Sequence, residues 1–240
     1  MPSVAKVVAS IKSAPMTKRA APVAKSTIQK FGVQLMEDVG ATDPFNLSSK
    51  RVQHYMANFA AKKIADVTKT TQARVAKTMT RAVDEGKTTE QIAKLLTDQF
   101  DQWSTGRAMT VARTEVGAAS NFGAFEGMQQ AGIEQKEWLA TDDDAVRETH
   151  QELDGEVVGI DEPFEIEGLE ADYPGDFGDP AEDTNCRCSV LPVVADKSVR
   201  HRWSMRATER ERKPFDKKMY TAVSKAFLDQ KAAALSALGA

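Results

Sequence analysis

Hydrophobic residues between positions 47 and 131 recur mostly at steps of three and four, which is the spacing of an amphipathic helix. We expect a first long helix that begins after Ser48 or Ser49, because either hydroxyl can cap the first turn. This helix is expected to end at Gly86. The stretch therefore predicts a helical region rather than a sheet.

Two further helices are expected before the pattern changes. Thr88 and Gln91 have the spacing of a capping box, which predicts a shorter helix over residues 88–100. A third helix is predicted over residues 104–131, ended by Gly132 in a left-handed cap. A glycine inside a helix costs up to ~1 kcal/mol relative to alanine. Those of the third helix are therefore expected to permit close packing against a neighbour: Gly117, Gly123 and Gly127.

Beyond residue 132 the periodicity becomes short and typical of β-strands. Residues 136–140, 156–160 and 189–194 are predicted strands, separated by turns rich in Asp, Gly and Pro. Residues 161–184 show little regular pattern, and a loop of that length is uncommon unless something ties it down. The chain is thus predicted to have an α+β fold, in which long helices are followed by a small β-rich, loop-rich module and a C-terminal helix.

The two ends of the chain are basic. Residues 1–30 lack sustained periodicity and are interpreted as a mobile basic arm that could include a short helix. A basic tail returns after residue 196, with a final helix over residues 213–238. The predicted regions are a basic arm and loop (1–46), a helical region (47–131), a small β-rich module (132–195) and a basic tail with a helix (196–240).

Composition places the 240-residue chain among ordinary globular proteins, with 41% hydrophobic and 28% charged residues. No apolar run approaches the roughly 20 residues that span a bilayer, and lysines interrupt every apolar stretch near the N-terminus. A protein that is soluble and intracellular where it is made is therefore expected.

The net charge of −3 conceals a segregation of charge along the chain. Residues 1–30 carry six basic and no acidic side chains, and residues 187–240 carry twelve basic and five acidic ones. Residues 134–185 carry two basic and nineteen acidic side chains, a net charge of −17. Basic ends favour an anionic partner, although a solvated acidic face with merely soluble tails explains the same charges.

The only two cysteines, Cys186 and Cys188, are separated by one residue. In a strand their side chains would point the same way about 6–7 Å apart, which suits a common metal better than a disulfide. With His150 and Asp154 they could form a tetrahedral Zn²⁺ site that pins the 161–184 loop. The alternative is two reduced cysteines in an apolar strand and an ordinary surface histidine.

The same residues could instead support catalysis. Glu148 or Glu152 could act as a general base beside an open metal position, or a cysteine next to Arg187 could act as a nucleophile. Neither idea has a second motif, since the chain lacks His-Glu-x-x-His, a Gly-rich phosphate loop and Gly-x-Ser-x-Gly. We therefore expect no enzyme activity. Late in the third helix, Arg113 and Glu115 could form a buried ion pair or lie on a solvated face.

Several short motifs occur in a recognisable order over about residues 108–192. The most specific are Arg-x-x-His-x-x-Leu-x-Gly at 147–155 and Cys-Arg-Cys at 186–188. Together the motifs resemble the phage Mu F-like family of head morphogenesis proteins, also called minor head or minor capsid proteins. Beyond the proposed ligands, the positions of the series that we expect to be structural are Arg113, Glu115, Trp138, Arg147, Gly155 and Arg187.

The resemblance implies a virion protein of a tailed bacteriophage, assembled in the host cytoplasm and placed inside the capsid near the portal vertex. Such a protein would act in head assembly and in genome packaging or ejection. The implied partners are the portal protein, capsid or scaffold proteins and double-stranded DNA, with no membrane. Non-specific phosphate contacts would come from the basic ends, with these candidates: Lys6, Lys12, Lys18, Arg19, Arg206, Arg210, Arg212 and Lys213.

Two other functions remain open from the sequence. One is a zinc-dependent hydrolase or toxin-like enzyme that is delivered with the genome. The other is a soluble adaptor or scaffold partner that leaves before the head matures.

Overall fold

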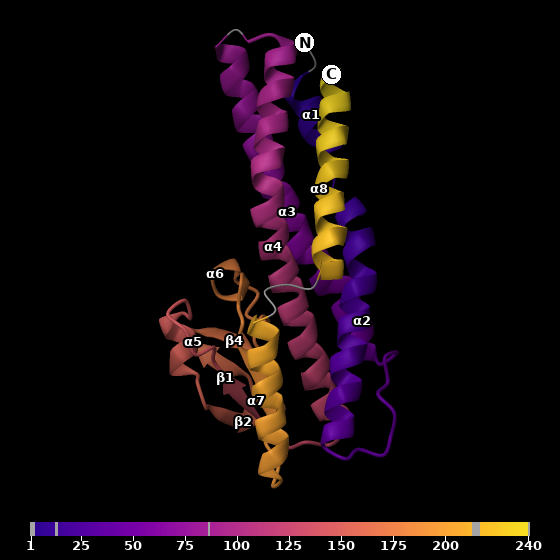
Figure 1. Cartoon of the computed structure of the whole chain (residues 1–240), viewed down its shortest axis with the longest axis vertical. Helices are drawn as coiled ribbons and strands as arrows, with labels where there is room; N and C mark the ends of the chain where they lie inside the picture. Colours follow the sequence, from indigo (N-terminus) through magenta and orange to yellow (C-terminus); the bar gives the residue numbers. More distant parts are fainter. Residues whose placement is uncertain (1–2, 13, 86, 213–216, 240) are drawn as a thin grey trace.

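The predicted α+β fold is confirmed: long helices form an elongated bundle, and a small lobe of short strands and loops lies against one half of it (Figure 1). The computed structural model describes the backbone of residues 3–12, 14–85, 87–212 and 217–239. Within these ranges it describes all side chains except those of residues 14–16, 59–67, 103–105, 206–212 and 217. The elements are α1 (Val4–Ser10), α2 (Ala14–Asp38), α3 (Lys50–Asp84), α4 (Thr89–Gln130), β1 (Gln135–Leu139), α5 (Glu148–Glu152), β2 (Val157–Gly159), β3 (Phe164–Ile166), β4 (Leu169–Ala171), α6 (Pro180–Asp183), β5 (Ser189–Pro192), α7 (Lys197–Arg212) and α8 (Lys217–Leu238).

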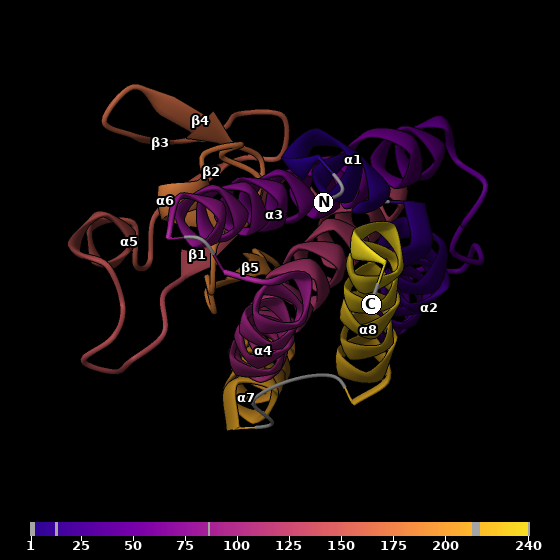
Figure 2. The same ribbon diagram turned by 90° about the horizontal axis from the view of Figure 1, so that it is seen from above.

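Helix α4 is the axis of the bundle, and α2, α3 and α8 pack along it (Figures 1 and 2). One hydrophobic core lies between these helices and the lobe, where Tyr55 of α3 stacks on Phe122 of α4 at 4.2 Å between ring centroids. A second core lies among α1, α3, α4 and α8 and includes Met79 and Phe100. The bundle therefore has one end that carries the lobe and one that is purely helical.

The helix boundaries follow the expected capping signals. Ser49 caps α3 by accepting a hydrogen bond from the backbone N–H of Val52 at 3.1 Å. Thr88 and Gln91 form the predicted capping box at the start of α4. Gly132 adopts φ +71° after the end of α4, as a left-handed cap requires. The predicted stop at Gly86 lies outside the described residues.

The prediction of two separate helices over 88–131 is wrong, because α4 is continuous from Thr89 to Gln130. The break was expected between residues 100 and 104, where polar residues interrupt the apolar stripe. These residues remain helical because the two apolar stretches on either side face different cores, one at each end of the bundle. Packing at both ends thus outweighs the weak local pattern.

The glycines of α4 allow neighbouring backbone to approach closely, as expected. A Cβ at Gly123 would lie 2.7 Å from the carbonyl oxygen of Ile28 in α2, and one at Gly127 would lie 2.9 Å from a methyl group of Leu35. A Cβ at Gly117 would lie 3.3 Å from the carbonyl oxygen of Cys186. The first two glycines therefore set the α2–α4 distance, and the third sets the distance between α4 and the lobe.

The prediction of a mobile basic arm over residues 1–30 is wrong. Residues 4–10 form α1 and residues 14–38 form α2, and both pack against the bundle. Apolar side chains at helical spacing anchor them, and Pro22 lies inside α2 without ending it. The composition, with no acidic residue before Glu37, hid an apolar face that includes Val7, Ile11, Ala20, Ala24 and Ile28.

The lobe contains a three-stranded antiparallel sheet with the order β2-β1-β5. Its strands lie where the sequence pattern predicted them, within two residues at each end. The irregular stretch 161–184 also contains a β3–β4 hairpin and the short helix α6, which were not predicted. Trp138 of β1 is fully buried at the centre of the lobe.

Lys136 of β1 joins the hairpin to the bundle. Its ammonium group donates a hydrogen bond to the carbonyl oxygen of Ile160 at 3.1 Å and lies over the rings of Phe125 and Phe164. Burial of this side chain lowers its pKa, and the nearby charge of Asp172 opposes that effect. The lobe is therefore fixed to α4 by a cation–π contact with Phe125 as well as by apolar packing.

The C-terminal region forms two helices rather than a tail with one. Helix α7 packs on β5 and on the sheet, where the guanidinium of Arg200 contacts the carboxylate of Glu137 in a bidentate pair. Helix α8 then returns along α4 and α2. Within the described parts of the chain, none of the helices has the length and apolar character needed to cross a membrane.

Candidate metal centre

His150, Cys186 and Cys188 converge in the interior of the lobe. The Nδ1 atom of His150 lies 3.6 Å from the sulfur of Cys186 and 3.5 Å from the sulfur of Cys188. The three ligand atoms lie within 4.8 Å of one another, and all three residues are buried. The structure thus brings the imidazole together with two thiols that lie 36 and 38 residues further along the chain.

The distances match those of a tetrahedral zinc site. Bonds of about 2.0–2.1 Å to nitrogen and about 2.3 Å to sulfur, at tetrahedral angles, place the nitrogen and the sulfur about 3.5–3.6 Å apart. Hydrogen bonds among the imidazole and the two thiols also hold these groups together, and the approach of one nitrogen to both sulfurs is the geometry that a shared metal ion would require. One metal ion would account for both contacts.

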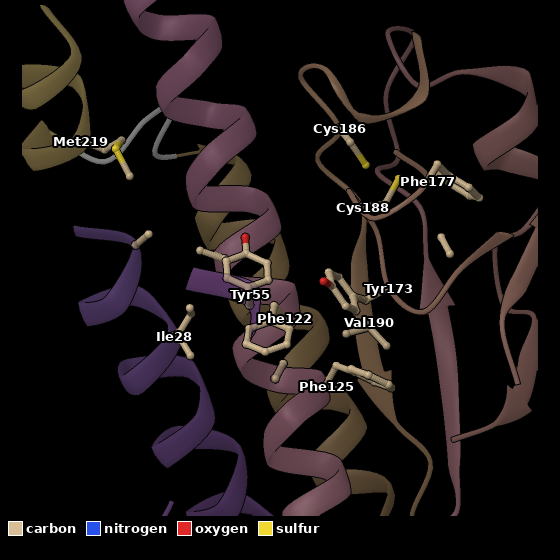
Figure 3. Packing of buried hydrophobic residues seen from close by; sticks show 14 of the residues in the cluster. Ile28, Tyr55, Phe122, Phe125, Tyr173, Phe177, Cys186, Cys188, Val190 and Met219 are labelled. Carbon is tan, nitrogen blue, oxygen red and sulfur yellow. The ribbon is translucent and has the colours of Figure 1, made fainter. Parts of the chain in front are cut away.

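Local structure presents each ligand to the common point. His150 lies on α5, which starts after Arg147, and the Arg147 guanidinium donates to the carbonyl oxygen of Thr184 at 2.6 Å. Asn185 adopts φ +58°, a left-handed conformation that turns the chain just before Cys186. Cys188 directly precedes β5. The two sulfurs lie close together on the side of Phe177 (Figure 3).

Helix α4 supports the cysteine segment from behind. The hydroxyl of Thr114 accepts a hydrogen bond from the backbone N–H of Asn185 at 3.0 Å. The side-chain amide of Asn121 donates to the carbonyl oxygens of Cys188, at 3.0 Å, and Pro174, at 2.9 Å. The Cys-Arg-Cys turn is therefore fixed to the longest helix by polar contacts.

Electrostatics favour the thiolate form of one cysteine. A hydrogen bond from Cys186 and then the proximity of His150 lower the pKa of Cys188 to about 5, against burial, which raises it. Thiolate is the form that binds metals and attacks electrophiles. Arg187, between the two cysteines, points outward and pairs with Asp143.

Asp154, predicted as the fourth ligand, is not part of the cluster. Helix α5 ends at Glu152, so the four-residue spacing from His150 does not place the two side chains on one helical face. Asp154 is exposed, and its carboxylate accepts a hydrogen bond from the backbone N–H of Ala140 at 2.8 Å. Gly155 follows with φ +79°, which explains a glycine at that turn.

The other predicted positions divide into buried and exposed residues. Glu115 is buried, and after burial itself its charge is the next cause that raises the pKa of Tyr55. Arg113 is half-buried. Glu148 and Glu152, considered as general bases, are both exposed. The acidic residue that faces the histidine is one that sequence reasoning missed, Glu182, whose Oε2 lies 3.1 Å from His150 Nε2.

The candidate DNA contacts come from the two basic ends of the chain. Lys6, Lys12 and Lys18 are exposed on or beside α1 and α2, whereas Arg19 pairs with Asp229 of α8 at 2.8 Å. Three further candidates belong to α7, and their side chains lie outside the described residues: Arg206, Arg210 and Arg212. Lys213 lies entirely outside the described residues.

The structure defines a helical bundle that carries a small lobe closed around a His/Cys/Cys group. The family model described as "Phage Mu protein F like protein" matches residues 73–191, just under half of the chain. The match confirms the resemblance seen in the sequence and extends it to the end of α3 and all of α4.

Individual relatives agree with this assignment. The chain is 34% identical over 97 residues to minor head protein GP7 of Bacillus phage SPP1, which is 39% of this chain and 32% of GP7. It is 32% identical over 180 residues to the uncharacterized protein YqbB of Bacillus subtilis, 72% of this chain and 58% of YqbB. It is 42% identical over 114 residues to NAD(+)–arginine ADP-ribosyltransferase EFV of Enterococcus faecalis, 46% of this chain and 23% of that protein.

The chain therefore spans between about a quarter and three fifths of these relatives. No solved structure matches the chain.

Proposed function

We propose that this protein is a structural component of the head of a tailed bacteriophage, located inside the capsid near the portal vertex. The similarity to a protein named as a minor head protein, within the Mu F-like match, carries this proposal. The buried position of the His/Cys/Cys group supports a role in holding the lobe together rather than in turnover. The portal protein and capsid or scaffold proteins are the proposed partners.

The test is the composition of purified particles. Mass spectrometry of mature virions and of DNA-free procapsids is expected to detect the chain in both. A strain that lacks it is expected to produce altered or poorly infective heads. Absence from both kinds of particle, together with normal assembly in the deletion strain, refutes the proposal, whereas presence in procapsids alone identifies an adaptor that leaves before maturation.

Packaged DNA is a further proposed partner. Besides Lys6 and Lys12, helix α3 exposes Lys69, Arg74 and Lys77, with no acidic residue from 67 to 83. Helices α1 and α3 pack side by side, so these cations lie on neighbouring elements at the purely helical end. Phosphate contacts give affinity without sequence preference, which falls steeply as salt rises.

DNA binding is tested by affinity for a random duplex at several salt concentrations. Replacing Arg74 and Lys77 with glutamine is expected to weaken binding at every sequence and to reduce the salt dependence. The control replaces Lys25 and Lys30, exposed on α2, in the same way. If the two double replacements weaken DNA binding equally, the DNA contact is not specific to the cations of α3.

We infer that His150, Cys186 and Cys188 hold a structural zinc ion. The 3.5 and 3.6 Å contacts of one nitrogen with two sulfurs support this inference. Metal analysis of the protein, followed by His150→Ala and Cys188→Ala, tests it. Combined loss of metal and of folding supports a structural role.

An enzyme is the second candidate function. The low pKa of Cys188 and the neighbouring His150 favour it, because this pair is typical of cysteine nucleophiles. One relative is named as an ADP-ribosyltransferase, although the chain covers only 23% of it. A variant that keeps its fold but loses a defined hydrolysis or transfer reaction would favour this candidate over a structural role.

A further inference from the structure

Glu182 approaches His150 from the side of the imidazole that faces away from the sulfurs. Its Oε2 atom lies 3.1 Å from Nε2, while Nδ1 faces Cys186 and Cys188. The carboxylate is 15% exposed and the histidine side chain 1% exposed, so little water competes for this contact. Glu182 is one of nineteen acidic residues between 134 and 185, and nothing in the sequence distinguishes it from the others.

The carboxylate is held in place by groups that do not belong to the metal centre. The hydroxyl of Thr149 donates to the same Oε2 atom at 3.0 Å. Helix α6, which carries Glu182, is capped by Asp179, whose carboxylate accepts a hydrogen bond from the backbone N–H of Ala181 at 2.7 Å. The next residue, Asp183, accepts hydrogen bonds from the backbone N–H groups of Phe177 and Gly178. Glu182 is thus positioned by Thr149 of α5 as well as by its own helix and loop.

The tautomer of His150 decides whether the ring can bind a metal through Nδ1. Coordination needs a lone pair on Nδ1, so the ring proton must reside on Nε2. A buried N–H without an acceptor is unfavourable, and Nε2 has no well-aligned hydrogen bond, although the Glu182 carboxylate lies 3.1 Å from it. Glu182 supplies a negatively charged acceptor within reach of that proton.

We propose that Glu182 is the positioning residue of the metal centre: its carboxylate holds the proton of His150 on Nε2 and so directs Nδ1 toward the zinc ion between the two cysteines. A carboxylate that accepts the Nε2 proton also raises the basicity of Nδ1 as a metal ligand and fixes the orientation of the ring. Zinc binding is thereby linked to α6, which lies in the stretch 161–184 that the sequence left without regular structure. The inference rests on the proposed zinc site.

The experiment compares zinc affinity in a graded series at this position. Glu182→Gln keeps an acceptor oxygen but loses the charge, and Glu182→Ala loses both. Exposed Glu152→Gln, on α5, removes the same charge from the acidic lobe without touching the histidine. Competition with a chromophoric chelator gives the affinity, Co²⁺ absorption reports the ligand geometry, and denaturation of the metal-free chain reports folding.

Glu182→Ala is expected to weaken zinc binding about 10–100-fold, with Glu182→Gln in between and Glu152→Gln unchanged. The thiolate-to-Co²⁺ bands should persist in Glu182→Ala while the ligand-field bands shift, and the metal-free chain should unfold as the wild type does. Affinity within twofold of wild type in Glu182→Ala overturns the proposal. The proposal is also overturned if the metal-free Glu182→Ala chain is less stable than the wild type by enough to account for its whole loss of zinc affinity. A wild-type chain that binds no zinc refutes the zinc site itself, a distinct result.

Discussion

The side-chain amide of Asn121, in the C-terminal third of α4, donates a hydrogen bond to the carbonyl oxygen of Cys188 at 3.0 Å. The same amide donates to Pro174, and its oxygen accepts from the backbone N–H of Val190 at 3.4 Å. One buried side chain therefore contacts three segments of the lobe: the loop before α6, the cysteine turn and β5. The metal centre and the helical bundle are coupled through this residue.

Asn121→Ala is expected to destabilise the protein by about 2–4 kcal/mol, because it leaves buried backbone groups without partners. Urea denaturation followed by circular dichroism measures the free energy of unfolding. The control is Asn58→Ala at an exposed position of α3, where the amide donates a hydrogen bond to the carbonyl oxygen of His54, one turn earlier in the same helix. The control should change the stability by less than about 0.5 kcal/mol. Similar effects of both substitutions would contradict the coupling.

The glycines of α4 provide a matched pair for the α2–α4 contact. Gly123→Ala should destabilise the protein by about 1–3 kcal/mol, because its methyl group would meet backbone of Ile28. Gly106→Ala, in the same helix with open space around it, should stabilise by up to about 1 kcal/mol. Thermal unfolding of the two variants is expected to shift in opposite directions. A neutral Gly123→Ala would mean that the two helices are not in close contact.

Asp176 gives the protein a pH-dependent stability. Burial, and then the charge of Asp172, raise the pKa of Asp176 to about 6, although a hydrogen bond with Tyr173 opposes them. Between the unfolded pKa near 3.8 and the folded value, the folded state binds more protons, so stability falls as pH rises through this window. Asp176→Asn should therefore be more stable than wild type at pH 8, by up to about 3 kcal/mol.

The measurement for Asp176 is the free energy of unfolding at pH 4 and at pH 8. At pH 4 the two proteins should differ in stability by much less than at pH 8, because the wild-type carboxyl is then protonated in the folded state and partly protonated in the unfolded state. A difference between them that is the same at both pH values would show that the substitution acts through packing rather than through ionisation.

The ionisation of Cys188 tests the arrangement of the two thiols in the metal-free protein. Since Cys186 is the largest cause of the lowered pKa, Cys186→Ala should raise the pKa of Cys188 well above 5. Cys186→Ser keeps a hydroxyl donor and should raise it less. Thiolate absorbance near 240 nm during a pH titration gives both values. An unchanged pKa in Cys186→Ala would indicate that the two sulfurs do not interact.

Local patterns in the sequence predicted the strands and the caps well. Ser49, Thr88 and Gly132 mark helix ends through chemistry that acts within four residues, and the strands of the sheet lie within two residues of their predicted bounds. The prediction of a mobile arm at residues 1–30 was wrong because the basic, proline-containing composition hid the apolar face on which Val7 and Ile28 lie. That face is stabilised by contacts with α4 and α8, which a local pattern does not contain.

The residues of the metal centre that local sequence patterns mark could be predicted, and those that depend on tertiary packing could not. The Cys-x-Cys spacing and the scarcity of histidine single out His150, Cys186 and Cys188. Asp154 was chosen on the assumption that the helix continues past Glu152, which it does not. Glu182, Thr114 and Asn121 depend on how α6 and α4 meet the cysteine turn, and a single sequence carries no signal for that arrangement.

The metal content of the protein tests the central claim most directly. Native mass spectrometry of the chain, purified without chelators and supplied with one equivalent of zinc, is expected to show one zinc ion per chain. The variant in which Cys186 and Cys188 are both replaced by serine should show none. A wild-type chain that remains metal-free under these conditions, or a double variant that binds zinc equally well, would contradict a lobe held together by His150 and the two cysteines.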